Sequence, residues 1–136
     1  MINISIKKSF LILKSILLFL VSKEIKQIKS SDKIIIYGAG TITNDLITSK
    51  KYTVHSIYDK YTNLNKIKDV PVLRLSTLNK NLIKFDYILI TPKYREFSIF
   101  QELHKEYNIP YNKFIFIDKT EITEFFYIYY LMITPF

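Results

Sequence analysis

The segment that most constrains the fold is a short apolar run followed by two closely spaced glycines. Residues 33–37 read KIIIY, and such an unbroken run is typical of a strand that is covered on both faces. Gly38 and Gly40 follow it directly, and they are the only two glycines in the chain. Because the chain uses glycine nowhere else, we expect both to be needed for backbone geometry. The segment therefore predicts a buried strand that ends in a tight turn.

The residues after the glycines have the pattern of a helix. Ile42, Leu46 and Ile47 form one apolar stripe over residues 41–50, while the polar side chains between them face away from it or cap the helix start. Thr43 is one of these polar residues, and it occupies the place of the third glycine in the pattern G-x-G-x-x-G. We therefore expect this helix to pack less closely on the strand than in a tight NAD site.

A strand, a glycine turn and a helix in this order form the first half of a dinucleotide-binding crossover. The glycines let the backbone approach a phosphate, and the free N–H groups at the helix start face the anion. An acidic residue is expected about 20 residues further on, where it accepts a hydrogen bond from a ribose hydroxyl, and Asp59 stands there. A simpler interpretation is that the glycines only make a turn in a domain that binds nothing, with Asp59 as a turn residue.

Strands and helices alternate along the rest of the chain. Further strands are expected over residues 52–58, 70–73, 86–91 and 113–117, a loop over 59–68, and helices over 76–83 and 92–107, the second with Phe97, Phe100, Leu103 and Tyr107 inward. This alternation predicts an α/β fold with a parallel sheet, most simply in the strand order 3-2-1-4-5.

Ligands of such a sheet bind beyond the carboxyl ends of the strands, where the strand order reverses. Here that point lies between the first and fourth predicted strands. The loops that end there predict a binding site formed by Gly38, Ala39, Gly40, Thr41, Ile42, Asp59 and Thr91, with Pro92 and Lys93 beside it.

The two ends of the chain have a different character from the middle. Residues 4–29 have the pattern of one long amphipathic helix, but their densest apolar part, residues 10–21, includes a lysine and a serine and is shorter than the roughly 20 residues of a membrane span. We expect this helix to pack on the sheet or on a second subunit; peripheral membrane contact and a cleaved signal peptide are the alternatives. Residues 119–136 are apolar and aromatic. The predicted organisation is an N-terminal helix over 1–30, a nucleotide-binding domain over 31–118 and a C-terminal apolar helix over 119–136.

Composition narrows the classes of partner and chemistry. The 136 residues include no cysteine, which excludes disulfides, thiolate metal sites and a cysteine nucleophile and fits a cytoplasmic protein. The net charge of +8 is concentrated in residues 1–33, which hold seven lysines against Glu24 and Asp32. We favour a solvated lysine-rich face over a basic surface for a phosphorylated ligand, an anionic membrane or a nucleic acid as the reason for this excess. We also expect most aromatic residues to pack in the core rather than to stack on bases.

Several short motifs together resemble a known family. The segments KIIIYGAGTITNDL, VHSIYDK, DVPVL and DYILIT are similar to the Rossmann-like nucleotide-sugar-binding domain at the N-terminus of bacterial sugar acyltransferases of the bacillosamine and sialic-acid type, and to the domain appended to sugar methyltransferases. The resemblance covers about residues 30–118. It implies a nucleotide or UDP-sugar bound at Gly38, Ala39, Gly40 and Asp59 in bacterial surface-glycan biosynthesis. The family's hexapeptide-repeat region does not follow residue 118, and Lys60 stands where many relatives have a second acidic residue.

The residues of a complete catalytic site are not evident. Many short-chain oxidoreductases use a Tyr-x-x-x-Lys pair as acid and base, and no tyrosine of this chain has a lysine four residues later. His55 and His104 lack the spacing of metal ligands, so we expect no metal site. The leading hypothesis is a nucleotide or nucleotide-sugar binding domain that forms a homo-oligomer or works beside a partner enzyme. The alternatives are a structural module that dimerises through its apolar ends and a small NAD(P)-dependent oxidoreductase or epimerase.

Overall fold

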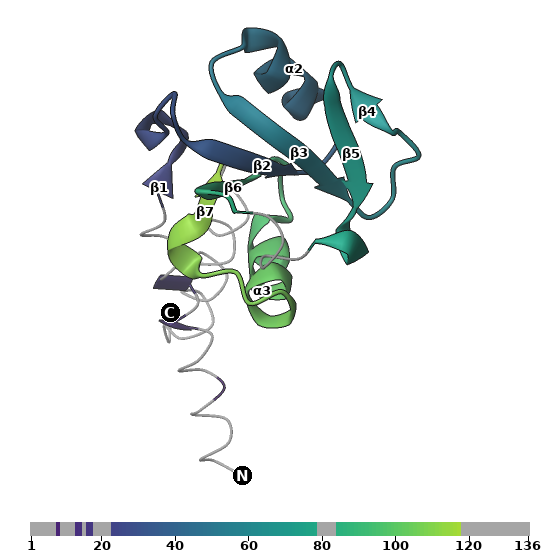
Figure 1. Ribbon diagram of the computed structural model, residues 1–136. Helices are drawn as coiled ribbons and strands as arrows, with labels where there is room; N and C mark the ends of the chain where they lie inside the picture. Colours follow the sequence, from purple (N-terminus) through teal and green to yellow (C-terminus); the bar gives the residue numbers. More distant parts are fainter. Residues whose placement is uncertain (1–7, 9–12, 15, 18–22, 79–83, 118–136) are drawn as a thin grey trace, which may run out of the picture.

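The computed structural model in Figure 1 describes residues 8, 13–14, 16–17, 23–78 and 84–117. Its strands are β1 (Lys23–Glu24), β2 (Lys33–Tyr37), β3 (Thr53–Asp59), β4 (Lys66–Ile67), β5 (Val70–Arg74), β6 (Tyr87–Ile90) and β7 (Phe114–Phe116), and its helices are α2 (Thr41–Ser49) and α3 (Glu96–Glu106), with the 3-10 helices η1 (Ile25–Gln27), η2 (Leu75–Thr77) and η3 (Tyr111–Lys113).

The strands form one mostly parallel sheet, which confirms the predicted α/β class. Their order is β1-β7-β6-β2-β3-β5-β4, and only the pairing of β4 with β5 is antiparallel. Strand β2 lies between β3 and β6. The chain therefore leaves β2 on one side through α2 and β3 and reaches its other side at β6. Strands β1 and β4 extend the two edges beyond the five strands expected from the sequence.

The central strand β2 is covered on both faces, as its sequence predicts. Ile34 and Ile36 belong to one apolar cluster, whereas Ile35 and Tyr37 belong to the other, because successive side chains of a strand point to opposite faces. The three isoleucines are completely buried. Each such side chain stabilises the fold by about 1.5–3 kcal/mol through removal of its apolar surface from water.

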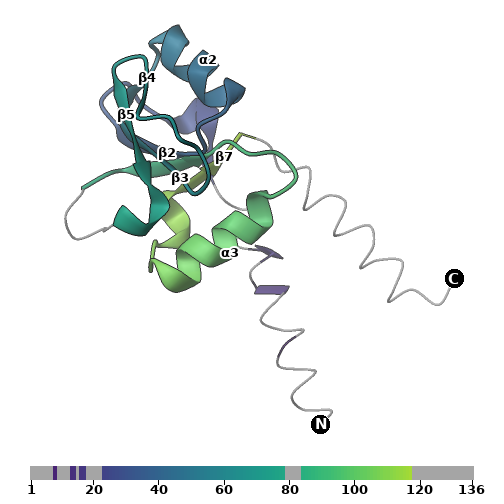
Figure 2. The same cartoon turned by 90° about the vertical axis from the view of Figure 1, so that its right-hand side faces the viewer.

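The two helices cover opposite faces of the sheet, as Figures 1 and 2 show. Helix α2 contributes Leu46 and Ile47 to the first cluster. Helix α3 contributes Phe97, Phe100 and Leu103 to the second, and these are the residues whose spacing predicted an inward stripe. Helices α2 and α3 therefore cover one face of the sheet each, and both run from the carboxyl end of one parallel strand to the amino end of another.

The N-terminal segment departs from the predicted helix over residues 4–29. The described residues 8, 13–14 and 16–17 are helical, but Lys23–Glu24 form β1 beside β7, and Ile25–Gln27 form η1. Ile25 and Ile28 pack against the first cluster. Burial of these side chains on the sheet, together with the main-chain hydrogen bonds offered by β7, therefore outweighs the helical pattern in this stretch.

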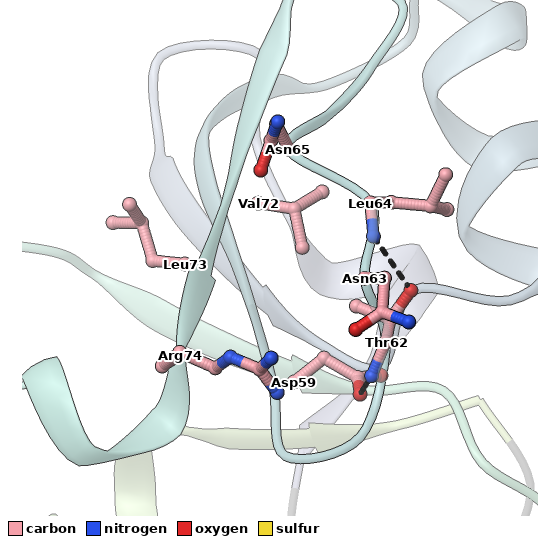
Figure 3. Close-up of a pocket in the computed structure, with 8 residues that line it drawn as sticks. All are labelled: Asp59, Thr62, Asn63, Leu64, Asn65, Val72, Leu73 and Arg74. Carbon is pink, nitrogen blue, oxygen red and sulfur yellow. Dashed lines mark hydrogen bonds between the residues drawn. The ribbon is translucent and has the colours of Figure 1, made fainter.

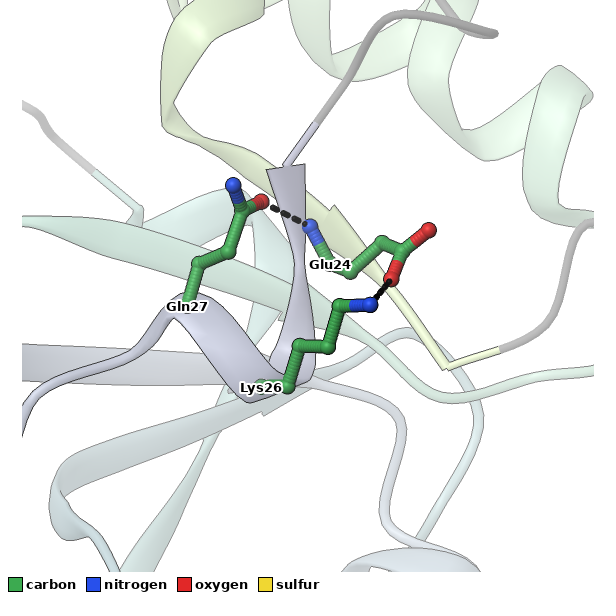
Figure 4. A network of polar contacts seen from close by, with 3 residues as sticks. All are labelled: Glu24, Lys26 and Gln27. Atoms are coloured by element: carbon green, nitrogen blue, oxygen red, sulfur yellow. Dashed lines mark hydrogen bonds and ion pairs between the residues drawn. The ribbon is translucent and has the colours of Figure 1, made fainter.

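Polar contacts hold the turn from β1 into η1. In Figure 4, the backbone N–H of Glu24 donates to Oε1 of Gln27 over 2.6 Å, and the Lys26 ammonium lies 3.2 Å from a Glu24 carboxylate oxygen. Both charged side chains are largely exposed, so the hydrogen bond to the main chain contributes more to this turn than the ion pair does.

Other predicted boundaries also need correction. The helix expected from Pro92 begins at Glu96, because the backbone at Tyr94 has φ of 64°, which interrupts a helix. The expected loop 59–68 contains β4. Of the helix expected over 76–83, residues 76–77 belong to η2 and residues 79–83 lie outside the described residues, as does the helix expected over 119–136. Among the residues that the structure describes, no helix combines the length and apolar character of a membrane span.

Candidate functional site

The turn after β2 brings the backbone into a conformation that only glycine adopts easily. Gly38 has φ of 106°, and a Cβ atom there would overlap Oγ1 of Thr91 and lie 3.0 Å from Cδ of Pro92. The Gly38 N–H donates to the carbonyl of Tyr58 over 2.8 Å. Gly38 is therefore required by the fold itself, because it lets the end of β2 pass close to the end of β6.

Gly40 differs from Gly38, because nothing in the structure requires its missing side chain. It is the N-cap of α2 with φ of −99°, which any residue can adopt. A Cβ atom at Gly40 would meet nothing within 4 Å. The absence of a side chain at Gly40 therefore keeps an open space in front of α2.

The first turn of α2 directs main-chain N–H groups toward this space. The first helical hydrogen bond is donated by Asn44 to the Gly40 carbonyl, and no side chain caps the helix start. The N–H groups of Thr41, Ile42 and Thr43 precede that bond and have no partner within the helix. Such a helix start carries a partial positive charge that favours an anion.

A cavity of about 450 Å³ lies in front of these N–H groups. Its walls are Gly38, Ala39, Gly40, Thr41, Ile42, Asp59, Thr91, Pro92 and Lys93. These residues come from the turn after β2, the first turn of α2, the last residue of β3 and the loop after β6, where the strand order reverses. The structure thus brings together every residue that the sequence predicts for the site, and its volume falls in the range of about 300–1,000 Å³ that is common for small-molecule sites.

Asp59 braces two loops with one carboxylate. Its Oδ2 accepts the Ala39 N–H over 2.9 Å, and its Oδ1 accepts the N–H groups of Tyr61 and Thr62 over 2.8 and 2.9 Å. Partial burial favours a higher pKa for this carboxyl, but the three backbone donors and the nearby Arg74 guanidinium outweigh it and lower the pKa. Asp59 is therefore ionised at neutral pH, and one of its roughly four lone-pair sites remains for a ligand hydroxyl.

Two buried threonines hold the glycine turn, and one of them, Thr91, also lines the cavity. The Thr43 hydroxyl lies 2.5 Å from the Gly38 carbonyl and 3.2 Å from the Thr91 hydroxyl, and the Thr91 hydroxyl donates to the Tyr37 carbonyl over 2.9 Å. Both side chains are almost completely buried. This corrects the expectation that Thr43 faces away from the sheet. Its hydroxyl makes a polar contact between α2 and the glycine turn, whereas a third glycine at this position would allow only close packing.

A tyrosine and an ion pair lie on the α3 side of the same edge. Burial raises the pKa of the Tyr37 phenol, and Glu102 raises it further against the opposing effect of Lys60. Lys60 and Glu102 form an ion pair over 2.7 Å, and the bond to Glu102 raises the pKa of Lys60. Because a phenol that exchanges protons near neutral pH needs a lowered pKa, these shifts do not favour Tyr37 as an acid or base.

A smaller hollow of about 140 Å³ adjoins the site at Asp59. Figure 3 shows it between β5 and the loop after β3, with the Val72 side chain directed into it and the Arg74 side chain extending toward Asp59. Nη1 of Arg74 donates to the Lys60 carbonyl over 3.0 Å. Arg74 therefore holds the loop after β3 against β5 and supports the position of Asp59.

The two histidines lie outside the cavity walls. The His104 ring stacks on Phe100 with centroids 5.7 Å apart, and its Nδ1 lies 2.8 Å from the Ile109 carbonyl oxygen. Nδ1 of His55 lies 3.0 Å from the Ser56 hydroxyl. Among the described residues there is no group of three or more His, Cys, Asp or Glu side chains that could hold a metal ion.

Comparison with known proteins identifies no relative: the chain matches no protein-family model and has no significant match among curated proteins.

Proposed function

We propose that the chain is a Rossmann-like domain that binds a nucleotide or nucleotide-sugar in the cavity in front of α2. The phosphate groups would lie against the N–H groups of Thr41, Ile42 and Thr43. Lys93 would supply a positive charge from the cavity wall, and Asp59 would accept a ribose hydroxyl. Support for this orientation comes from the cavity's place at the carboxyl ends of β2, β3 and β6, where the strand order reverses.

The open space at Gly40 is the observation that carries the proposal. A glycine that the backbone does not need, at the start of a helix with uncapped N–H groups, is well explained by a ligand that approaches the main chain there. Gly38 offers no such support, because its φ and its contact with Thr91 already explain it. The two glycines of the turn are thus explained differently: the fold requires Gly38, and the proposed ligand requires Gly40.

Binding can be tested by thermal unfolding with pyrophosphate, UDP, a UDP-sugar, AMP and NAD. A ligand that binds only the folded chain raises the melting temperature, and 100 times its Kd corresponds to about 2.7 kcal/mol. We expect Gly40→Val and Lys93→Ala to reduce the rise. Lys51→Ala, a change of an exposed lysine before β3, is the matched control. If none of these ligands shifts the melting temperature of the unaltered chain, the proposal is wrong.

The surface-glycan role belongs to the same proposal and is supported only by the motif resemblance over residues 30–118. A preference for UDP-sugars over AMP and NAD in the same measurement would support it. Equal binding of all three would leave a general nucleotide-binding domain and remove the reason to place the chain in that pathway.

A second candidate function, self-association, has one observation in its favour. In the helical part of the N-terminal segment, Leu13 and Leu17 are 38% and 51% exposed, although Ile16 beside them is buried. An apolar helix face of this kind is typical of contact with another molecule. Light scattering after size-exclusion chromatography should show a dimer that Leu17→Gln weakens; a monomer at all concentrations would rule this candidate out.

A further inference from the structure

Two exposed tyrosines stand at the carboxyl edge of the sheet, and one of them is held in place. Tyr61 follows β3 and is 73% exposed, whereas Tyr94 follows β6 and is 61% exposed. The ring of Tyr61 lies 6.0 Å from the Arg95 guanidinium carbon, which is within the range of a cation–π contact. Because Tyr61 is 73% exposed despite this contact, its ring stays accessible to a ligand.

The backbone that carries Tyr61 is fixed by the same carboxylate that fixes the glycine turn. Oδ1 of Asp59 accepts the Tyr61 N–H over 2.8 Å, and Oδ2 accepts the Ala39 N–H over 2.9 Å. The residue before Tyr61, Lys60, is tied to α3 by its ion pair with Glu102. The exposed ring is therefore joined to the cavity wall through a single carboxylate group.

We propose that Tyr61, backed by Arg95, is the stacking platform for the base of the nucleotide ligand. This inference rests on the proposed function, because it needs phosphate groups at α2. In a nucleotide the ribose joins the base to the phosphate. In the chain the Asp59 carboxylate joins Tyr61, through Oδ1, to the glycine turn, through Oδ2. A ring that is already held in place loses little conformational freedom when a base stacks on it, and every base has a flat face to offer.

The cations at this edge of the sheet agree with an anionic, ring-bearing ligand. Lys93 lines the cavity, and Arg95 carries a planar guanidinium that can share its stack on Tyr61 with a base. The acidic Glu102 on the same side is paired with Lys60. Asp59 is held by three backbone donors, so its charge is partly balanced.

The chain contains no tryptophan, so Tyr61→Trp creates a single fluorescent reporter at the platform. We expect UDP and AMP to quench its emission, and pyrophosphate to leave the emission unchanged while still raising the melting temperature. Tyr111→Trp is the matched control, because Tyr111 is 44% exposed and lies in η3, before the amino end of β7. Its emission should respond to none of the three.

Removal of the Tyr61 ring measures how much stacking contributes to nucleotide affinity. Tyr61→Ala should weaken nucleotide binding roughly 5- to 150-fold, the range for loss of one base stack, and leave pyrophosphate binding unchanged, whereas Tyr61→Phe should keep the affinity. If nucleotides bind the unaltered chain but neither quench the emission of Tyr61→Trp nor lose affinity in Tyr61→Ala, the platform is refuted and the proposed function stands. If neither pyrophosphate nor any nucleotide binds, both are refuted.

Discussion

The two glycines of the turn allow a sharp test, because substitution by alanine should reduce stability at position 38 and ligand affinity at position 40. In Gly38→Ala the new methyl group would overlap Thr91 Oγ1 and touch Pro92. The backbone there has φ of 106°, which an L-residue adopts only with strain. In Gly40→Ala the methyl group would enter open space on a backbone that any residue adopts.

The expected loss of stability in Gly38→Ala follows from three terms. Positive φ costs an L-residue about 1–2 kcal/mol, and overpacking against Thr91 and Pro92 costs about 1–3 kcal/mol. The lower entropy of the unfolded chain returns about 0.4–1 kcal/mol. We therefore expect a net loss of about 1–4.5 kcal/mol. For Gly40→Ala, the entropy gain and the poorer N-cap nearly cancel, and the change should stay within about 0.5 kcal/mol.

Urea unfolding followed by circular dichroism measures both changes, and ligand-induced thermal shifts measure binding. For a chain of this size, a loss of about 1–4.5 kcal/mol corresponds to a melting temperature about 3–14 °C lower. Gly40→Ala should keep its melting temperature and lose affinity for pyrophosphate. Equal stability of the two variants would refute the strain assigned to Gly38. Unchanged binding by a well-folded Gly40→Ala would refute the role of Gly40.

Three further predictions concern the polar groups around the turn. The pKa of Asp59 is lowered in the folded chain, so the unfolded chain binds more protons near the ordinary pKa of an aspartate. The stability that Asp59 contributes is therefore present above about pH 4 and declines as the pH falls further. Asp59→Asn should flatten this decline in acid-unfolding curves, and an unchanged curve would contradict the prediction. Thr43→Val should cost about 1–3 kcal/mol in urea unfolding, because the buried Gly38 carbonyl loses its hydroxyl donor; a change below about 0.5 kcal/mol, well under that range, would show that the carbonyl needs no such partner. A double-mutant cycle of Lys60→Met and Glu102→Gln should give a coupling of about 0.2–1 kcal/mol that shrinks with salt, since both side chains are partly exposed; a coupling insensitive to salt would contradict this.

Local pattern was sufficient where one strong signal decided the structure. The run 33–37 could only be buried, and β6 and β7 are short apolar runs of the same kind. The site residues could be predicted because parallel strands place their carboxyl ends at one edge, so separate loops meet there without any knowledge of side-chain contacts. The predicted edge and the cavity walls coincide for that reason.

Pattern failed where a distant partner decided the outcome. The periodicity of α2 places the polar Thr43 outward, but its hydroxyl is satisfied by the Gly38 carbonyl and by Thr91, which lies 48 residues away. Its place in the glycine pattern was the available signal, since a side chain there must face the strand. The rule that proline suits a helix start misplaced the start of α3, because it says nothing of the backbone turn at Tyr94. Tyr61 carried no motif, and only its exposure and its neighbours distinguish it.

The short strand β1 determines how well a truncated form of this protein stays in solution. Its two residues occupy the outer side of β7, opposite Ile115 and Phe116. A chain shortened to residues 31–118 would leave those amides and carbonyls unpaired along an apolar border, and such a border recruits strands from other molecules. A fragment that keeps every wall of the cavity would then aggregate because it lacks two residues that lie outside those walls.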